Sequence, residues 1–522
     1  MIAKVRTAAL LGIEAQPVSL EVDLTRSGMP AFTLVGLAEG AVREAKERVL
    51  SALKNAGYKL PPARITVNLA PADLRKEGSA YDLPLALCLL AASESIDAGR
   101  LAPEGEGGWF LAGELSLDGA LKPVPGILPL AILARAQGAT GLIVPGGNAA
   151  EAAVVQGLCV YGVDSLAQAV RIVTGPLTGD DAPSPTKVDV DALWAGQAGA
   201  EGDFAEVKGQ DHAKRAIEIA AAGGHNLLFV GPPGSGKTML SQRIPTVLPP
   251  LTFDEALEVT KIYSVAGMLE RDAALIVRRP FRSPHHTISD AGLIGGGVNP
   301  RPGEVSLAHR GVLFLDELPE FKKHVLEVLR QPLEDGRVTI SRAAQSLTYP
   351  SDFMLVAAMN PCPCGYLTDD RHVCSCQPLA ILRYRSRISG PLMDRIDMQV
   401  EVPAVPYEDL KAPRGSRDSA TMRAGIVKVR ATQSARYKGS GIRLNADLQG
   451  ALLERWCKVG EAEHQFLEQA VRRLGLSARA YTRVLRIART IADMEDAETI
   501  EIPHLAEAIN FRTMDRVNAP QG

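Results

Sequence analysis

The amino-acid sequence predicts a multidomain α/β protein, and three observations support that fold class. The chain has 522 residues, enough for about three to four domains of ordinary size. Residues 226–230 are a short apolar run that leads into a glycine-rich loop, and a helical stretch begins at Lys237, as in a parallel α/β sheet. From about Tyr407 onward, the pattern is helical. We therefore expect an N-terminal α+β domain, a central α/β domain and a C-terminal helical lid.

The composition is that of a globular protein. Hydrophobic residues make up 46% of the chain and charged residues 22%, with a mean hydropathy of +0.03, which excludes disordered and fibrous proteins. The apolar run 83–92 is too short to cross a membrane and soon meets Glu94, so we expect no membrane partner and a cytoplasmic location. Because the net charge is only −3, any nucleic-acid surface is expected to be local.

The first block, residues 1–175, mixes strand and helix patterns, which indicates an α+β domain. Residues 19–24 alternate as a strand does, and residues 40–55 have one apolar helical face. The residues on that face are Val42, Ala45, Val49 and Leu53.

A linker at residues 176–203 is rich in glycine, proline, aspartate and serine, a composition that does not fold alone. It separates the first block from the central domain, 204–405, and the helical lid, 406–522. The helical stretches expected in the lid are 423–436, 449–459, 462–474, 478–495 and 502–511.

The glycine-rich loop fits the pattern G-x-x-x-x-G-K-T between a strand and a helix, which predicts a nucleotide site. The loop consists of Gly231, Pro232, Pro233, Gly234, Ser235, Gly236, Lys237 and Thr238. Its backbone N–H groups are expected to wrap phosphate oxygens, while Lys237 reaches the terminal phosphates and the Thr238 hydroxyl ligates magnesium. ATP and Mg²⁺ are the cofactors that this pattern predicts.

Two further strands end in polar residues suited to hydrolysis. The apolar strand before Asp316 and Glu317 ends in this acidic pair. We expect Asp316 to hold magnesium through water and Glu317 to deprotonate the attacking water. The strand 353–359 ends at Asn360, whose amide would position that water; the alternative is an ordinary Asn-Pro turn.

Two excursions interrupt the central domain. Lys237 and Asp316 are 79 residues apart (316 − 237), and residues 278–310, with a glycine-rich tip at 295–297 expected to be flexible, hold the excess. Residues 336–350 predict a hairpin with strands 338–341 and 346–349 and a turn that exposes Arg342. We expect Arg342 to contact DNA phosphates; the alternative is an ion pair with Glu334 or Asp335.

Four of the seven cysteines form two C-x-C pairs nine residues apart, which predicts a zinc site. The four are Cys362, Cys364, Cys374 and Cys376. The alternatives are reduced structural thiols or a redox pair, and His372 is a possible substitute ligand. The arginines that follow, in 383–387, interleave with an aromatic residue and are further candidates for phosphate contact.

The segments GPPGSGKT, GVLFLDE, AAMNPCPCG, GPLMDRID and LSARAYTRVLRIARTIAD resemble those of the magnesium-chelatase-like AAA+ ATPases, and specifically the ComM (YifB) competence family. The resemblance covers nearly the whole chain. It implies a hexameric ATPase in which Arg395 is supplied to the neighbouring subunit's nucleotide and Arg479, from the lid, acts as the second sensor. It also implies, from the related minichromosome maintenance helicases, that the two excursions line a central pore.

The alternative for Arg395 is a surface arginine without a catalytic role, paired with Asp394 or Asp397. Three later arginines recur at helical spacing after Arg479 and are expected to form a solvated or interface stripe. They are Arg483, Arg486 and Arg489.

Residues 113–145 and 76–80 resemble the Lon protease domain, which has a ribosomal S5 domain 2-like fold. On that match, the catalytic serine position falls on Ala80 and the lysine position on Leu128. Neither can act as nucleophile or base, and Ser79 lacks a base in the matched place. We therefore expect a scaffold or a DNA-facing collar.

Together these features predict an ATP-dependent homohexameric motor that acts on single-stranded and branched DNA. It would be a helicase that drives branch migration in natural transformation and recombination. The main alternative is a chelatase-type ATPase that drives magnesium insertion into a porphyrin. The Lon-like domain and the cysteine quartet argue against this alternative. The third class, an ATP-dependent protease, lacks its catalytic dyad.

Overall fold

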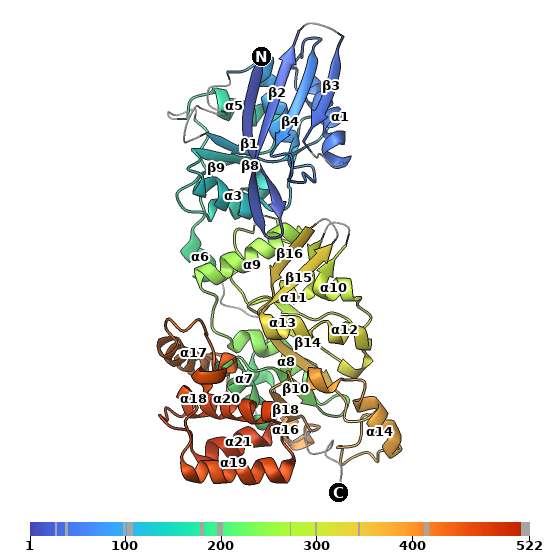
Figure 1. The fold of residues 1–522 in the computed structure, drawn as a ribbon, viewed down its shortest axis with the longest axis vertical. Helices are drawn as coiled ribbons and strands as arrows, with labels where there is room; N and C mark the ends of the chain where they lie inside the picture. Colours follow the sequence, from blue (N-terminus) through green and yellow to red (C-terminus); the bar gives the residue numbers. More distant parts are fainter. Residues whose placement is uncertain are drawn as a thin grey trace. The chain divides into compact units, whose positions relative to one another are not determined.

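The computed structural model describes residues 1–26, 29–36, 40–97, 101, 108–177, 182–195, 202–271, 273–297, 300–342, 345–411 and 417–512, without the side chains of 41–43, 342, 345 and 410 (Figure 1). The chain forms two compact units. One consists of Met1–Gly196 with Phe253–Val277, and the other of Gln197–Thr252 with Arg278–Gly522. The segment Phe253–Val277 thus groups with the N-terminal part, although it lies within the stretch that the sequence pattern assigns to the central domain.

The first unit contains a seven-stranded mixed sheet in the order β3-β4-β2-β1-β5-β8-β9. Its strands are β1 (Ile2–Leu11), β2 (Glu14–Thr25), β3 (Ala31–Val35), β4 (Arg64–Ala70), β5 (Trp109–Leu111), β8 (Gly141–Pro145) and β9 (Cys159–Val163). The short strands β6 (Glu114–Leu115) and β7 (Leu121–Lys122) form a separate antiparallel pair. Only β1–β2 and β2–β4 pair antiparallel within the large sheet.

The first unit contains seven described helices, and all of them except α6 have buried residues. They are α1 (Gly40–Asn55), α2 (Asp82–Ala92), α3 (Ile127–Ala136), α4 (Gly146–Ala153), α5 (Leu166–Thr174), α6 (Val190–Ala195) and α9 (Phe253–Ala266). Every residue of α2 is buried, so the apolar run 83–92 is a core helix. On α1, Ala45, Val49 and Leu53 are buried as the periodicity predicts, while the side chain of Val42 lies outside the described residues.

Helix α9 is fastened to the first unit by polar contacts as well as by packing. Lys261 forms an ion pair with Glu14 at 2.9 Å, and the Ser264 hydroxyl donates to the carboxylate of Glu151 at 2.7 Å. Glu151 is buried and also accepts hydrogen bonds from Asn148 and from the backbone of Leu128. Burial raises the pKa of Glu151, and the hydrogen bonds from these donors partly offset that rise by stabilising the charged carboxylate.

The second unit contains a five-stranded, all-parallel sheet in the order β11-β14-β17-β10-β18. Its strands are β10 (Leu227–Val230), β11 (Phe281–Arg282), β14 (Val312–Leu315), β17 (Met354–Met359) and β18 (Met398–Glu401). The central strands β10, β14 and β17 are buried throughout, as expected for a sheet covered on both faces. The parallel sheet and the helical C-terminal region agree with the fold class that the sequence predicts.

Short helices and turns connect these strands. They are η1 (Phe204–Glu206), α7 (Asp211–Gly223), α8 (Lys237–Val247), η2 (Leu318–Glu320), α12 (Lys323–Glu327), α13 (Arg330–Asp335), α14 (Pro378–Arg385) and α15 (Gly390–Met393). The C-terminal helices are α16 (Tyr407–Lys411), α17 (Ser419–Arg436), α18 (Gly450–Trp456), α19 (Glu461–Leu474), α20 (Ala478–Met494) and α21 (Ile502–Asn510), with the turn η3 (Asn445–Asp447).

Of the two alternatives for the arginine stripe of α20, the solvated face is wrong, and the interface between subunits stays a prediction. Each guanidinium faces inward, because α20 packs against α7, α17 and α21, and each has an internal partner. The pairs are Arg483 with Asp397 at 3.1 Å, Arg486 with the Leu448 carbonyl at 2.7 Å, and Arg489 with Asp493 at 2.8 Å.

The two excursions pack against each other (Figure 1). One contains α10 (Asp290–Ile294), β12 (Gly295–Gly296), β13 (Arg301–Pro302) and α11 (Glu304–Leu307); the other is the hairpin of β15 (Arg337–Arg342) and β16 (Gln345–Pro350). The Tyr349 hydroxyl donates to the Pro300 carbonyl at 2.7 Å. A side chain at Gly295 would meet Ile340 and the Arg301 carbonyl, so glycine is required there. Gly295 and Gly296 pair in β12 rather than forming a free tip.

Candidate functional site

The predicted phosphate-binding loop, called the phosphate loop below, joins β10 to α8 at the carboxyl edge of the parallel sheet. Gly234 and Gly236 have left-handed backbones, with φ of +75° and +90°, and a side chain at Gly231 would lie 2.0 Å from the Val402 carbonyl. These positions therefore need glycine. The Lys237 ammonium lies inside the loop, 2.8 Å from the Gly231 carbonyl and 2.9 Å from that of Pro232, and burial lowers its pKa.

The two expected magnesium ligands meet across the sheet edge. The Thr238 hydroxyl donates to one oxygen of Asp316 at 2.7 Å, and the backbone N–H of Glu317 donates to the other at 2.9 Å. A hydroxyl and a carboxylate are oxygen donors, which is the ligand type that Mg²⁺ prefers. The donor set therefore fits magnesium.

Glu317 has a partner that the sequence pattern did not identify. Its backbone is left-handed, with φ of +52°, which is unusual for a residue other than glycine. Its carboxylate lies 3.5 Å from Nδ1 of His286, whose ring packs against that of His285 with a centroid separation of 4.1 Å. The two adjacent histidines in the excursion 278–310 are the feature of the sequence that could have indicated this contact.

Asn360 follows β17 and reaches the same loop. Its side-chain oxygen lies 3.4 Å from the Lys237 ammonium. The next segment packs on the loop too, because a side chain at Gly365 would come within 2.6 Å of Pro233. The structure thus gathers Lys237, Thr238, Asp316 and Asn360 at one edge of the sheet.

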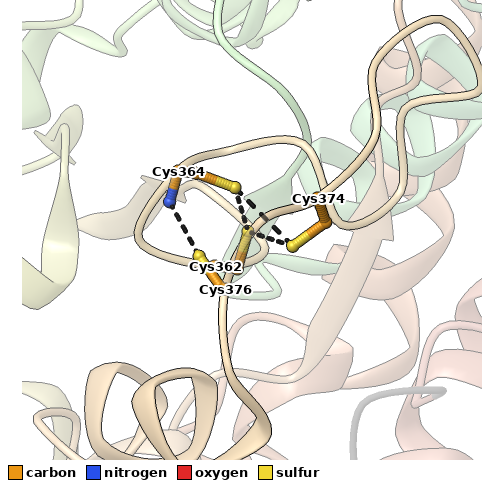
Figure 2. Close-up of side chains that lie close together, drawn as sticks. All are labelled: Cys362, Cys364, Cys374 and Cys376. Carbon is orange, nitrogen blue, oxygen red and sulfur yellow. Dashed lines mark hydrogen bonds between the residues drawn. The ribbon is translucent and has the colours of Figure 1, made fainter.

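The four cysteine sulfurs cluster directly after Asn360 (Figure 2). The Sγ atoms of Cys362, Cys364 and Cys374 lie 3.4 to 3.7 Å apart, and Cys376 Sγ accepts from the Cys364 backbone at 3.3 Å. In a tetrahedral zinc site with bonds of about 2.3 Å, sulfurs are about 3.8 Å apart. The four ligand atoms lie within 4.8 Å of one another, so the cluster fits a metal ion. His372 instead pairs with Asp369 at 2.7 Å.

The two expected phosphate-sensing arginines form a second group. Arg395 contacts Glu334 and donates to the Pro391 carbonyl at 2.6 Å, and Arg479 pairs with Asp394 at 3.3 Å. Burial lowers the pKa of Arg395, and the nearby charges of Arg330 and Arg479 add to this effect.

In the part of the chain that the structure describes, no hydrogen bond or ion pair joins Arg395 or Arg479 to the phosphate loop. Asp397, the other alternative partner of Arg395, pairs with Arg483.

The remaining candidate cations differ in how they are held. Arg385 donates to the Pro361 carbonyl at 3.2 Å and Arg387 pairs with Glu320 at 2.8 Å. Arg383 is exposed and lines a cavity of about 620 Å³ together with Lys323. The backbone of Arg342 pairs with Gln345 at the end of the hairpin rather than in its turn, and its side chain lies outside the described residues.

The positions matched to a protease dyad form no catalytic pair. Leu128 is fully buried in α3. The Ser79 hydroxyl contacts Glu114, and the buried ammonium of Lys76 donates to the Pro71 carbonyl. Serine and lysine in this segment are therefore occupied by other partners. Among the described helices, none combines the length and the apolar character needed to span a membrane.

Three family models match the chain in succession. The one described as "Subunit ChlI of Mg-chelatase" matches residues 20–148, "Magnesium chelatase, subunit ChlI" matches 203–410, and "Magnesium chelatase, subunit ChlI C-terminal" matches 416–512. The second of these contains the phosphate loop, the acidic pair, Asn360 and the cysteines. These matches imply an ATPase that uses ATP and Mg²⁺.

Relatives match over nearly the full length. "Competence protein ComM" of Haemophilus influenzae is 45% identical over 518 residues, covering 99% of this chain and 98% of that protein. "Uncharacterized protein YifB" of Salmonella typhimurium is 43% identical, with the same coverage of each chain. The "Magnesium-chelatase 38 kDa subunit" of Cereibacter sphaeroides is 25% identical over 30% of this chain and 52% of its own. The chain therefore belongs to the ComM (YifB) family of magnesium-chelatase-like AAA+ proteins.

Proposed function

We propose that this protein is an ATP-driven hexameric motor on single-stranded and branched DNA, a helicase that drives branch migration in natural transformation and recombination. One observation carries the proposal. Lys237, Thr238, Asp316 and Asn360 meet at one sheet edge, whereas Arg395 is bonded elsewhere, to Glu334. Phosphoryl transfer needs positive charge beside the transferred group, which is itself negative. A second copy of the chain would therefore have to supply the arginine.

Each residue of the site has a part in this reaction. Lys237 neutralises the terminal phosphates, and Thr238 and Asp316 would hold magnesium, which would supply further positive charge to the phosphates. Glu317 takes a proton from the attacking water, which Asn360 orients. Arg395 is supplied to the neighbour's nucleotide, and Arg479, which pairs with Asp394 next to Arg395 in the chain, acts as the second sensor from the lid.

The DNA-contacting part of the proposal rests on the two excursions. They pack together through Tyr349 and Gly295, so that we treat them as one DNA-contacting part. We propose that Arg342, at the end of the hairpin, contacts phosphates in the pore of the ring. A relative with 45% identity is named a competence protein, which supports an action on incoming DNA.

We further propose that the cysteine quartet binds structural zinc. The four sulfurs would complete a closed tetrahedral site, as structural zinc requires. By its contact with Pro233, Gly365 would transmit that rigidity to the phosphate loop. Reduced thiols and a DNA substrate fit a cytoplasmic location. The division into domains at 1–175, 204–405 and 406–522, with the linker 176–203, also stays a proposal.

The test is steady-state ATP hydrolysis by the full-length protein with and without single-stranded or branched DNA, together with strand displacement on a four-way junction. Stimulation by DNA and ATP-dependent displacement are the expected results. A Glu317→Gln preparation is the control for contaminating ATPases. Hydrolysis that DNA leaves unchanged, without displacement of any junction, contradicts the proposal.

The second candidate is a chelatase-type ATPase that drives magnesium insertion into a porphyrin. The three family models and the Cereibacter relative favour it, although that relative covers only 30% of this chain. Porphyrin-dependent stimulation of hydrolysis in the presence of chelatase partner subunits would support this candidate over the DNA motor.

A further inference from the structure

The guanidinium of Arg395 forms an ion pair with a carboxylate from a distant part of the sequence. Glu334 lies on α13, 61 residues earlier in the chain, and its carboxylate contacts Nη2 of Arg395. Nη1 donates to the Pro391 carbonyl at 2.6 Å. The Arg395 side chain is 9% exposed, whereas that of Glu334 is 57% exposed, so the carboxylate faces solvent while the guanidinium is covered.

The helix that carries Glu334 continues directly into the hairpin. Helix α13 ends at Asp335, Gly336 turns the chain with φ of +64°, and β15 begins at Arg337. The Ser351 N–H donates to the Gly336 carbonyl at 2.9 Å, which closes the base of the hairpin. A displacement of β15–β16 therefore moves α13, and with it the carboxylate that holds Arg395.

The Arg395 guanidinium does not have a hydrogen-bond partner for every one of its nitrogens. Its Nε is buried and has no hydrogen-bond partner among the residues described. Arg330 and Arg479 place two more positive charges nearby, and together with burial they lower the pKa of Arg395. Glu327 adds a second carboxylate whose charge opposes this effect, but of these two carboxylates only Glu334 contacts the guanidinium. A nucleotide phosphate, with several anionic oxygens, would satisfy this group better than that single contact does.

We propose that Glu334 is a positioning residue that stores Arg395 within its own subunit and releases it when a ligand displaces the hairpin β15–β16. Contact between DNA and the hairpin would then deliver the arginine to the neighbouring subunit's ATP, which couples DNA binding to hydrolysis. The inference rests on the proposed function, because it takes Arg395 as the arginine supplied in trans.

The test compares Glu334→Gln with Asp335→Asn in the full-length protein. Asp335 is the adjacent exposed carboxylate of α13 and, within the described ranges, makes no hydrogen bond or ion pair with Arg395. We expect Glu334→Gln to raise the DNA-free kcat by roughly two- to fivefold, the population shift that a partly exposed ion pair can hold. KM for ATP should stay unchanged, because the arginine acts on the transition state. The ratio of DNA-stimulated to DNA-free hydrolysis should fall, and Asp335→Asn should leave all three quantities as in the wild type.

The Arg395→Ala background separates the possible failures. There, Glu334→Gln should have no effect on the residual kcat, and an increase that persists would overturn the inference. If Arg395→Ala loses hydrolysis but Glu334→Gln matches the wild type in both kcat and the stimulation ratio, the storage role is wrong and the trans arginine stands. If Arg395→Ala hydrolyses ATP normally, the trans arginine itself is wrong, and the inference fails together with the proposed function.

Discussion

In the proposed reaction Lys237 and Glu317 act at different stages of hydrolysis, and single substitutions should separate them. The Lys237 ammonium lies among the loop carbonyls, where the ground-state phosphates bind, so Lys237→Ala should lose ATP binding. As the proposed base, Glu317 would act on water only in the transition state, so Glu317→Gln should bind ATP and hydrolyse it about 10²- to 10⁴-fold more slowly. Binding of a fluorescent ATP analogue and release of phosphate measure the two effects. Undiminished turnover by Glu317→Gln would contradict its assignment as the base.

The residues that sequence predicts at the site are those whose role follows from local spacing. The loop is contiguous, and Asp316 and Asn360 end buried parallel strands, whose carboxyl ends share one edge. His286 and Glu334 could not be predicted in this way. Each contacts its partner, Glu317 or Arg395, only because segments far apart in the chain fold together.

At the scale of elements, the cysteine segment gives a direct prediction. The purified protein should carry close to one zinc per chain, and Cys362→Ser or Cys374→Ser should lose it, with a lower Tm, because metal binding contributes to folding free energy. Metal analysis by mass spectrometry and thermal melting measure this. Cys159→Ser is the control, since Cys159 is exposed and lies outside the quartet. A zinc-free wild type with equal stability would favour plain thiols.

The hairpin β15–β16 should determine how binding depends on salt. Arg342→Ala is expected to weaken binding to all DNA sequences alike and to flatten the salt dependence, because it removes one phosphate contact per subunit. DNA-free hydrolysis and hexamer formation should be unchanged. Titrations of DNA affinity across a salt series check this, with Arg337→Ala at the other end of β15 as the control. An unchanged slope with normal strand displacement would remove Arg342 from the DNA contact.

Elements differ in how much of their environment the sequence pattern predicts. Alternation identified the hairpin, whose strands extend one residue further than expected at each side of the turn. Helical spacing identified α20 but did not decide between the two environments expected for its arginines. Spacing places them on one face, and only the packing of α7, α17 and α21 decides that this face is covered. Ion pairs such as that of Arg489 with Asp493 then make burial possible.

At the scale of the whole molecule, the trans arginine is testable by mixing subunits. Arg395→Ala should bind ATP without hydrolysing it, and Lys237→Ala should not bind it. In an equal random mixture about a quarter of the interfaces in a ring combine an intact loop with an intact arginine, so partial activity should return. Phosphate release is the measurement, and exchange of subunits is first verified with labelled protein. A mixture that exchanges and stays inactive rules out Arg395 as the arginine supplied in trans.

Helix α9 has a consequence for dissecting the protein by proteolysis or truncation. The chain enters the first unit twice, so cleavage near residue 196 yields a fragment without Ser264 and Lys261. Its buried Glu151 would lose a hydrogen-bond donor, at a cost of about 1–3 kcal/mol, and the surface that α9 covers would be exposed. Residues 1–196 should therefore unfold at lower urea concentration than the same fragment fused through a short linker to 253–277. The two units thus alternate along the chain instead of following one another, so a cut at any single point leaves at least one of them without part of its sequence.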